Sequence, residues 1–534
     1  MARSGDVVVT QPTSISEDLD LDQLTIVGLL ERAARRWPDR TAYVHEERRF
    51  SWSELGDEVD LHARAFMAWG IAPGDRVSVW MGNTMSWVLV ELGLIRAGAV
   101  VVPVNTGFTV AEAAYVVDQS DSVMLVAAST LRGRDLAEEA RQVLNAAGLP
   151  ARALVTVGAT SGATSLDDLL AGAASVSPQD SAQRAAALQP DDVVLTLYTS
   201  GTTGFPKGVM HSHRVIGNMS DAATRLRLDE QDLAVMYLPL FHIFALAATV
   251  TFMVRGSAMV LMEVFDAADS LDLMERERAT LAYGVAPHYL DQIRHPSFAG
   301  RDLSTLRLCL SPGSADLVRM VSAHMAPAIS VYGMTETTSM TSLGALEDPL
   351  DIRADTVGRA LPRSTVKIVD ERGEEVAPGV VGHLLVKGPP VMRGYYKMPE
   401  ATADAIVDGW FHTGDAVSVD AEGYLRFAGR IKEIYKVGGE NVDPIEVESA
   451  LMRHPAVAFA CAQGVPDERM GEVGLAHVTV LPGHALDVEE LRVFARGQLA
   501  AFKVPRHVVV VDELPMTASG KVRKFVLREQ FLST

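Results

Sequence analysis

A polar, glycine-rich run at residues 199–208 carries the residue types that bind phosphate. It reads Thr-Ser-Gly-Thr-Thr-Gly-Phe-Pro-Lys-Gly, so hydroxyls, unhindered backbone N–H groups and the ammonium of Lys207 lie in one short segment. Backbone N–H groups can form an anion-binding nest, to which hydroxyl and ammonium donors add further hydrogen bonds. A lone Gly-Thr-Thr-Gly would favour an ordinary surface turn. The full run after an apolar strand predicted at 193–198 favours a phosphate-binding loop.

The spacing of this run differs from two common nucleotide-binding motifs. A P-loop requires Gly-x-x-x-x-Gly-Lys followed by Ser or Thr, whereas here Pro206 precedes Lys207 and Gly208 follows it. The Gly-x-Gly-x-x-Gly pattern of dinucleotide-binding folds does not match either. Beyond the loop, Ser212 is predicted to cap a helix over residues 214–225.

A second polar segment, Tyr-Gly-Met-Thr-Glu-Thr-Thr at 332–338, follows a strand predicted at 329–331. Tyr332 can stack on a base and Thr335 can donate to a phosphate. Glu336 can hold a Mg²⁺ ion that bridges phosphates. A strand end with a polar turn is the alternative, and the combination with the phosphate loop favours the nucleotide site.

Three later segments also carry side chains suited to chemistry. Asp415 ends Trp-Phe-His-Thr-Gly-Asp, and its carboxylate can accept from both vicinal hydroxyls of a ribose. Lys521 ends the polar segment 515–521, where a lone lysine would ordinarily be a solvated charge. Residues 437–441 form a Gly-rich turn that another backbone can approach closely. The segment Gly-Tyr-Tyr-Lys at 394–397 precedes them, without an assigned role.

These segments resemble the motifs of the adenylate-forming superfamily, which includes acyl-CoA synthetases, peptide-synthetase adenylation domains and beetle luciferases. The run 198–208 resembles the family signature, and the other motifs follow in the family's order between about residues 24 and 530. The resemblance implies an acid–thiol ligase that works in two steps. A carboxylic acid and ATP give acyl-AMP and pyrophosphate, and the thiol of CoA then gives acyl-CoA and AMP.

The resemblance also implies roles for individual residues. ATP binding is assigned to Thr199, Ser200, Gly201, Thr202, Thr203, Gly204, Lys207, Gly313, Ser314, Tyr332, Gly333, Met334, Thr335, Asp415, Arg430 and Lys521. Catalysis is assigned to Lys521, Thr335, Glu336 and His242, with Glu336 also holding Mg²⁺. CoA binding is assigned to Lys436, Gly438, Gly439 and Glu440, and the hinge between domains to Lys432. The turn at 311–316, Ser-Pro-Gly-Ser-Ala-Asp, departs from the family's Gly-Gly-Ala-Pro-like turn and leaves the adenine contacts open.

The acyl pocket is assigned to Phe241, His242 and Ala286, with the small or apolar residues Ala245, Ala247, Ala248 and Val285 as further candidates. From its residue type alone His242 could equally be a satisfied core histidine. Peptide-synthetase domains usually offer an aspartate to the amine of their substrate, so Phe241-His242 disfavours an amino acid. Aliphatic, alicyclic and aryl acids all stay open.

Strands and helices alternate along most of the chain, which predicts an α/β fold with helices covering parallel sheets. We expect a tail at 1–20, a large domain of αβα-type subdomains with a small β-rich part at 21–429, and a mobile α+β domain at 430–534. Ser51 and Glu54 predict a capping box. Residues 156–189 are predicted to be a loosely ordered connection, and 233–254 a strand, a turn and a buried helix rather than a membrane span.

The amino-acid composition disfavours some classes of binding partner. With 48 basic and 68 acidic residues the net charge is −20, so nucleic acid and anionic membranes are poor partners. Two cysteines, Cys309 and Cys461, cannot form a disulfide framework, and the first residues predict no signal peptide. We expect a cytoplasmic enzyme acting on a carboxylic acid, ATP and CoA, with a homodimer left open.

Three alternatives to a CoA ligase remain. The enzyme could load a carrier-protein thiol, which an absence of CoA dependence would reveal. It could be specialised to thioesterification from a preformed acyl-adenylate, for which the unusual turn at 311–316 is the only hint. A non-catalytic nucleotide-binding regulator is the third, and the presence of Lys207, Glu336, Asp415 and Lys521 argues against it.

Overall fold

The computed structural model describes residues 20–21, 23–158, 160–199, 206–431, 433–437, 440–516 and 522–533. The chain divides into two compact units. The first comprises residues up to 366 together with 386–411, and the second comprises 367–385 together with the chain from 412 onward. The mixed α/β architecture predicted from the sequence is confirmed.

In the described part of the chain, the first unit contains a nine-stranded sheet, which is parallel through its centre. Its strands, in spatial order, are β18 (Arg359–Ala360), β17 (Ser342–Leu343), β16 (Ala328–Tyr332), β15 (Leu308–Ser311), β14 (Leu281–Tyr283), β12 (Leu233–Met236), β13 (Ala258–Leu261), β1 (Thr41–His45) and β2 (Arg48–Ser51). The central strands β12, β13 and β14 are apolar along their whole length, as expected for a parallel sheet covered on both faces.

An eight-stranded sheet accompanies it in the same unit. Its order is β21 (Gly394–Tyr395), β11 (Lys207–Ser212), β10 (Val193–Thr199), β4 (Val100–Pro103), β3 (Arg76–Trp80), β5 (Ser122–Ala128), β8 (Leu154–Val157) and β9 (Thr164–Ser165). A short hairpin of β6 (Thr130–Leu131) and β7 (Arg134–Asp135) follows β5. The pairing of β11 with β10 and β21 is antiparallel, and the rest of the sheet is parallel.

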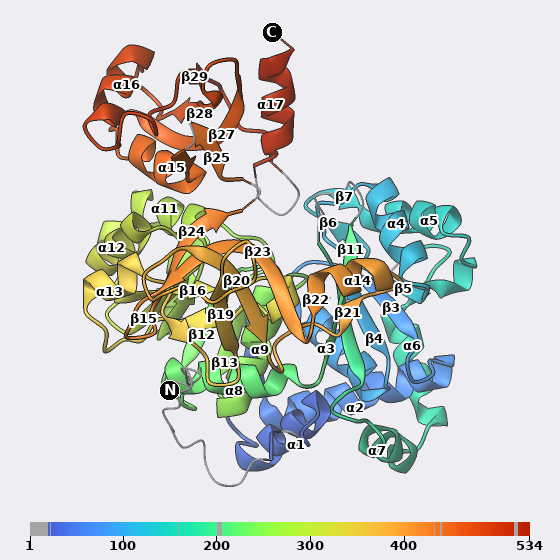
Figure 1. Ribbon diagram of the computed structural model, residues 1–534. Coiled ribbons are helices and arrows are strands. Elements are labelled where there is room, and N and C mark those ends of the chain that lie inside the picture. Colours follow the sequence, from blue (N-terminus) through green and yellow to red (C-terminus); the bar gives the residue numbers. More distant parts are fainter. Residues whose placement is uncertain are drawn as a thin grey trace, which may run out of the picture. The chain divides into compact units, whose positions relative to one another are not determined.

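Helices cover both faces of both sheets (Figure 1). One hydrophobic core joins the facing sides of the two sheets through α1 (Ile26–Arg36), α2 (Trp52–Trp69), α3 (Met85–Arg96), α8 (Val215–Arg225) and α9 (Ile243–Arg255). A second core lies between the nine-stranded sheet and α10 (Ala267–Arg276), α11 (Ala286–Arg294), α12 (Ala315–His324) and α13 (Leu350–Asp355). A third lies between the eight-stranded sheet and α4 (Val110–Gln119) and α5 (Leu136–Ala146). The first unit also contains α6 (Leu166–Ala171), α7 (Pro178–Ala186) and α14 (Pro399–Ala405).

Two smaller sheets contain the described strands of the second unit. The first consists of β19 (Thr365–Val369), β20 (Gly382–Lys387), β23 (Trp410–Val419) and β24 (Leu425–Arg430), and β22 (Ile406–Val407) pairs with the start of β23. The other consists of β26 (Glu440–Val442), β25 (Tyr435–Val437), β28 (Gly471–Val480), β27 (Val457–Asp467) and β29 (His507–Val510). Its helices are α15 (Pro444–Met452), α16 (Val488–Arg496) and α17 (Lys524–Leu532). The predicted domain boundary near Arg430 stays a prediction.

Two local predictions are confirmed and two are wrong. Ser51 and Glu54 form the expected capping box of α2, and residues 233–254 contain β12, a turn and the buried helix α9. Ser212 does not cap α8, because it ends a strand, β11, that the sequence reasoning missed. Residues 156–189 are not a loose connection, since they contain α6 and α7, each begun by a capping serine.

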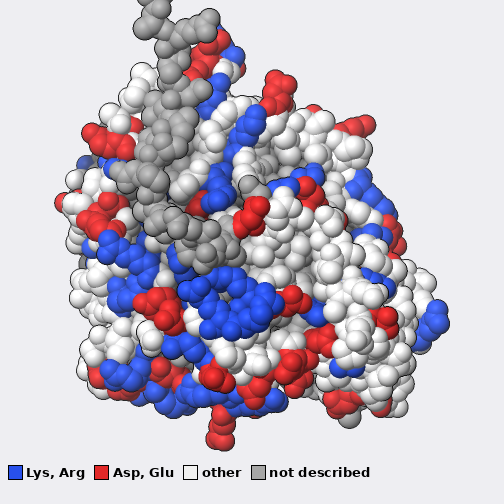
Figure 2. All heavy atoms as spheres, turned by 90° about the horizontal axis from the view of Figure 1, so that it is seen from below, with Lys and Arg blue, Asp and Glu red and all other residues white. Residues whose placement is uncertain are grey.

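Among the described residues, no helix is long and apolar enough to cross a membrane. The charges are unevenly distributed: Figure 2 shows Lys and Arg side chains gathered into a patch on one face, between acidic groups. Net charge alone therefore does not describe every face of this acidic chain.

Gly358 is a position where the fold requires glycine. Its φ is +75°, and a Cβ there would lie 2.1 Å from the backbone carbonyl of Leu343. We expect Gly358→Ala to lower the free energy of unfolding by about 3 kcal/mol or more, because strain and a backbone clash add. Gly133→Ala is the control, since Gly133 has φ +78° but no atom within 4 Å, and should cost about 1–2 kcal/mol. Equal losses in urea unfolding would contradict the packing argument.

Candidate functional site

Most of the predicted residues of the first unit follow the carboxyl ends of neighbouring parallel strands. Phe241 and His242 follow β12, Ala286 follows β14, Gly313 and Ser314 follow β15, and Tyr332 ends β16. In open α/β sheets ligands bind at this edge of the sheet. The topology therefore places the predicted acyl and adenine residues on one edge.

Several of these side chains are held by the starts of helices. Ser314 caps α12, with its hydroxyl accepting from the N–H of Leu317 at 3.3 Å. His242 is the N-cap residue of α9, and its half-buried ring lies 4.8 Å from the ring of Phe241. Ala286 is the half-buried first residue of α11. Two aromatic rings in contact, those of Phe241 and His242, therefore lie at the N-terminus of the apolar helix α9.

The ends of the predicted phosphate loop are joined by sheet pairing. Thr199, the last residue of β10, pairs with Lys207, the first residue of β11. The hydroxyl of Tyr115 on α4 donates to the carbonyl oxygen of Pro206 at 3.1 Å. The loop therefore connects two antiparallel strands, and not a strand and a helix as predicted. Ser200, Gly201, Thr202, Thr203 and Gly204 lie outside the described residues.

The turn after β16 is tightly folded around Gly333. A Cβ on Gly333 would lie 2.2 Å from the backbone carbonyl carbon of Ser339. Thr338 and Ser339 adopt φ of +55° and +61°, a region that residues other than glycine rarely occupy. Such strain persists only where the surrounding structure imposes it, and it often accompanies functional sites. The strain falls directly after Thr335 and Glu336, which lie in a short 3₁₀ turn, η4 (Thr335–Thr337).

The structure brings two predicted residues of opposite charge to one tyrosine. The hydroxyl of Tyr395 on β21 donates to Oε1 of Glu336 at 3.1 Å. The Nζ atom of Lys207 lies 4.9 Å from the centre of the Tyr395 ring, which is a cation–π contact. Glu336 is only 9% exposed, so its carboxylate is held in place by protein contacts.

The backbone of Thr335 contacts β11, the strand that begins at Lys207. Nε2 of His211 on β11 lies 2.6 Å from the carbonyl oxygen of Thr335. Burial lowers the pKa of His211 to about 4, so the ring is neutral at pH 7. Because a carbonyl oxygen only accepts, Nε2 carries the proton and donates.

Sequence reasoning missed both His211 and Tyr395. The Gly-Tyr-Tyr-Lys segment was the only signal for Tyr395, and its partner Glu336 lies 59 residues away in sequence. His211 lies in β11, a strand that was not predicted, so the sequence did not indicate toward which residues the His211 side chain points.

In the second unit the predicted ribose ligands form a pair. Asp415 on β23 lies opposite Arg430 on β24 in the sheet register, and Nε of Arg430 is 3.0 Å from Oδ1 of Asp415. Asp415 is 2% exposed, and its backbone N–H donates to the hydroxyl of Thr413. The arginine thus contacts a buried carboxylate in the middle of β23.

The predicted CoA residues lie on a hairpin of the second unit. Lys436 on β25 and Glu440 on β26 are both exposed and frame the turn between these strands. Gly438, Gly439, the hinge residue Lys432 and the catalytic candidate Lys521 lie outside the described residues. The segment containing Lys521 has closed ends, since Met516 and Val522 form an antiparallel bridge and the N–H of Arg523 donates to the carbonyl of Pro515 at 2.7 Å.

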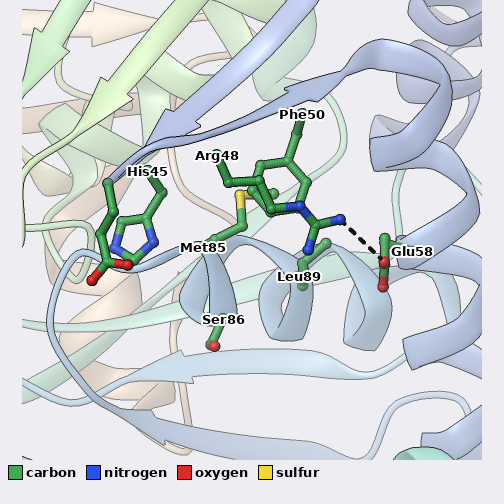
Figure 3. Close-up of a pocket in the computed structure, with 8 residues that line it drawn as sticks. His45, Arg48, Phe50, Glu58, Met85, Ser86 and Leu89 are labelled. Carbon is green, nitrogen blue, oxygen red and sulfur yellow. Dashed lines mark ion pairs between the residues drawn. The ribbon is translucent and has the colours of Figure 1, made fainter.

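A pocket of about 270 Å³ lies elsewhere in the first unit (Figure 3). It is lined by His45, Glu46, Arg48, Phe50, Glu58, Met85, Ser86 and Leu89. Arg48 lies over the ring of Phe50 at 4.0 Å and pairs with Glu58 at 3.8 Å, as Figure 3 shows. Among the described residues, no predicted site residue lines it, and its one arginine pairs with Glu58. It is therefore not the candidate site.

Comparison with known proteins agrees with the resemblance seen in the sequence. The family described as AMP-binding enzyme matches residues 30–396, and the AMP-binding enzyme C-terminal domain matches residues 446–521. These matches cover both the phosphate loop and the segment containing Lys521.

Three similar proteins illustrate the family. A propanoyl:CoA ligase of Mycobacterium tuberculosis, whose acid carries a methyl-dioxo-octahydroindenyl group, is 38% identical over 95% of this chain and 99% of its own. The mitochondrial medium-chain acyl-CoA ligase ACSF2 of Mus musculus is 32% identical over 96% of this chain and 88% of its own. The crystal structure of ATP-bound MatB from Rhodopseudomonas palustris has a TM-score of 0.82 at 30% identity, covering 95% and 99% of the two chains. The chain belongs to the family of AMP-binding enzymes, the adenylate-forming acyl-CoA synthetases.

Proposed function

We propose that this enzyme activates a predominantly apolar monocarboxylic acid with MgATP and transfers the acyl group to CoA. The enzyme is an AMP-forming acid–thiol ligase. In the first step a carboxylate oxygen attacks the α-phosphorus of ATP and pyrophosphate leaves. In the second step the CoA sulfur attacks the acyl carbon, its proton is lost and AMP leaves.

One observation carries this proposal. Lys207, at the end of the phosphate loop, and Glu336, after β16, converge on Tyr395 although they come from two different sheets. An ammonium can neutralise phosphate charge, and a carboxylate beside it can hold the Mg²⁺ ion that bridges phosphates. Opposite charges that contact the same tyrosine next to a loop of this composition suit a metal-bound triphosphate.

The adenylation step depends on positioning and charge neutralisation more than on proton transfer. Ser200, Thr202, Thr203 and Lys207 would hold the β- and γ-phosphates. Thr335 would donate to the α-phosphate, and Glu336 would bind Mg²⁺. Asp415 would accept from the ribose hydroxyls with Arg430 beside it, and Lys521 would neutralise charge between the carboxylate and the α-phosphate.

The thioesterification step requires Lys521 to withdraw so that the thiol can reach the acyl carbon. A rotation about Lys432 would do this, because a few backbone dihedrals at one junction can absorb a domain motion. The hairpin containing Lys436, Gly438, Gly439 and Glu440 would then approach the arm of CoA. A mobile C-terminal domain from residue 430 is thus part of the proposal.

The acyl group would lie against the start of α9. Ala245, Ala247 and Ala248 of this helix are buried, and Phe241 lies beside His242 at its N-terminus. The relatives named above act on a fused-ring propanoic acid and on medium-chain acids. We therefore place the substrate among medium-chain aliphatic and alicyclic acids, which would connect the enzyme to fatty-acid metabolism. A cytoplasmic location and a homodimer also stay predictions.

A panel of acids tests this assignment. Short, medium-chain, long-chain, alicyclic and aryl acids are each mixed with enzyme, MgATP and CoA, and pyrophosphate and acyl-CoA are measured. We expect the highest kcat/KM with medium-chain or alicyclic acids. Preference for an amino acid or a dicarboxylate would contradict the apolar pocket. Product formation with a carrier-protein thiol but not with CoA would contradict the choice of CoA.

The ribose role of Asp415 predicts a change in ATP affinity. Asp415→Asn removes the charge and leaves Arg430 without its partner, so we expect the KM for ATP to rise about tenfold with a smaller change in kcat. Asp408→Asn is the control, because Asp408 is exposed with φ +52°, a conformation that Asn tolerates. An unchanged KM for ATP in Asp415→Asn would contradict the ribose assignment.

A further inference from the structure

The segment around Tyr395 is fixed by backbone hydrogen bonds to both halves of the phosphate site. The N–H of Met392 donates to the carbonyl oxygen of Glu336 at 2.8 Å. The N–H of Tyr396 donates to the carbonyl oxygen of Gly208 at 2.8 Å, and β21 pairs with β11 through Val209 and Met210. Tyr395 therefore stands between the strand that begins at Lys207 and the turn that contains Glu336.

The side chain of Tyr395 contacts both charged residues through different groups. Its hydroxyl donates to Oε1 of Glu336 at 3.1 Å, and its ring lies 4.9 Å from Nζ of Lys207. Tyr395 is 8% exposed and Glu336 is 9% exposed. A hydrogen bond to a buried carboxylate is stronger than one between neutral groups, because little water competes for the charge.

The neighbouring backbone permits little adjustment of this tyrosine. Gly394 has φ +133°, and a Cβ there would lie 2.8 Å from Cγ2 of Thr402 on α14. The N–H of Tyr395 donates to the hydroxyl of the same threonine at 2.9 Å. The ring is thus placed by β11 on one side and by α14 on the other.

We propose that Tyr395 is a positioning residue for adenylation: its hydroxyl orients the Glu336 carboxylate toward Mg²⁺, and its ring holds the Lys207 ammonium beside the phosphates. This inference rests on the proposed roles of Glu336 and Lys207. It assigns a function to the first tyrosine of the Gly-Tyr-Tyr-Lys segment, which the proposed function leaves without one.

The protonation state of Tyr395 agrees with this role. Burial and the neighbouring Glu336 carboxylate raise the pKa of Tyr395 above its ordinary value. The phenol stays protonated throughout the neutral range, so it donates to Glu336 at every pH at which the enzyme would be assayed.

Two substitutions separate the two contacts. Tyr395→Phe removes the hydroxyl and keeps the ring, whereas Tyr395→Leu removes both. Tyr396→Phe is the matched control, since the hydroxyl of Tyr396 donates to Oδ2 of Asp121 at 2.8 Å. Adenylation is followed as ATP–pyrophosphate exchange with the best acid of the panel while Mg²⁺ is titrated. Thioesterification is followed separately from the preformed acyl-adenylate and CoA.

For Tyr395→Phe we expect the half-saturating Mg²⁺ concentration to rise at least fivefold and the exchange rate to fall roughly tenfold. Thioesterification should stay within twofold of the wild type. Tyr395→Leu should additionally raise the KM for ATP, because the ring contact with Lys207 is lost. Tyr396→Phe should match the wild type in all three measurements.

Two results would overturn the inference. One is an unchanged Mg²⁺ dependence in Tyr395→Phe, and the other is an equal loss in both half-reactions, which would indicate a merely structural tyrosine. In either case an active wild type leaves the proposed function standing. A wild type that forms no adenylate with any acid would overturn both.

Discussion

Alanine in place of Lys521 is expected to slow adenylation by about 10²–10³-fold while leaving thioesterification nearly intact. Lys521 is proposed to neutralise charge that develops between the attacking carboxylate and the α-phosphate, and losing one such group costs about this much. In the second half-reaction the same lysine is withdrawn, so its removal should have little effect. The two steps are measured separately, as pyrophosphate release from MgATP and as acyl-CoA formation from the acyl-adenylate.

The control for this variant is Lys503→Ala. Lys503 belongs to the same unit and pairs with Glu446 at 2.6 Å, a partly exposed ion pair that should contribute less than about 1 kcal/mol to stability. Both half-reactions should survive its loss. Parallel losses of both steps in Lys521→Ala would contradict the two-step account, because they would mean that the lysine acts on both or only supports the fold. The bridge between Met516 and Val522 closes the segment independently of the Lys521 side chain.

Glutamine in place of Glu336 is expected to lower the adenylation rate about 10²-fold and to raise the half-saturating Mg²⁺ concentration. The substitution preserves the size of the side chain and an acceptor for the Tyr395 hydroxyl, but removes the charge that binds the ion. Excess Mg²⁺ should restore part of the rate, because the phosphates themselves still bind the metal. The measurement is ATP–pyrophosphate exchange over a range of Mg²⁺ concentrations.

Glu347→Gln supplies the matched control. Glu347 forms an ion pair with Arg227, and both side chains are largely exposed, so the same chemical change should leave adenylation unaltered. If Glu336→Gln kept the wild-type rate and Mg²⁺ dependence, the metal role of Glu336 would be wrong. The role of Lys207 would stand independently.

Much of the fold could be predicted because its strands and helices have clear local patterns. The strands predicted at 193–198 and 329–331 agree with β10 and β16 to within one residue, and the capping box of Ser51 was found from four residues. Residues 156–189 were misjudged because Ala, Gly and Ser dominate them. Their helices α6 and α7 depend on capping serines and on packing against α2, which composition does not reveal.

The strand β11 shows why a motif can be recognised while its local structure is missed. Its sequence, Lys-Gly-Val-Met-His-Ser, is short, and Ser212 at its end was interpreted as a helix cap, although the helix itself was predicted within one residue of α8. The strand exists because it pairs with β10 on one side and β21 on the other. β21 is distant in sequence, so no local signal could establish that pairing, and the run between β10 and β11 was interpreted as a loop that leads into a helix.

Among the residues of the candidate site, those in recognisable local motifs could be singled out from the sequence, and those that depend on tertiary contacts could not. Tyr332 could be singled out because its motif directly follows an apolar strand, whereas Asp415 lies inside β23 and was singled out from the family resemblance; the ligand roles of both stay predictions. Tyr395 and His211 could not be singled out, since each acts by contacting a residue of another element. Only the tertiary fold brings their donors to Glu336 and Thr335.

The most direct test of the central claim is to identify the products of ATP in the complete reaction. Enzyme, ³²P-labelled MgATP and the best acid of the panel are incubated with and without CoA, and the labelled products and acyl-CoA are separated. The account predicts AMP and pyrophosphate in equal amounts, with turnover that rises when CoA is added and acyl-CoA formed one for one with AMP. Formation of ADP and phosphate would contradict the adenylation mechanism. Acyl-CoA made from a synthetic acyl-adenylate but never from the acid and ATP would show that this chain performs only the second half-reaction.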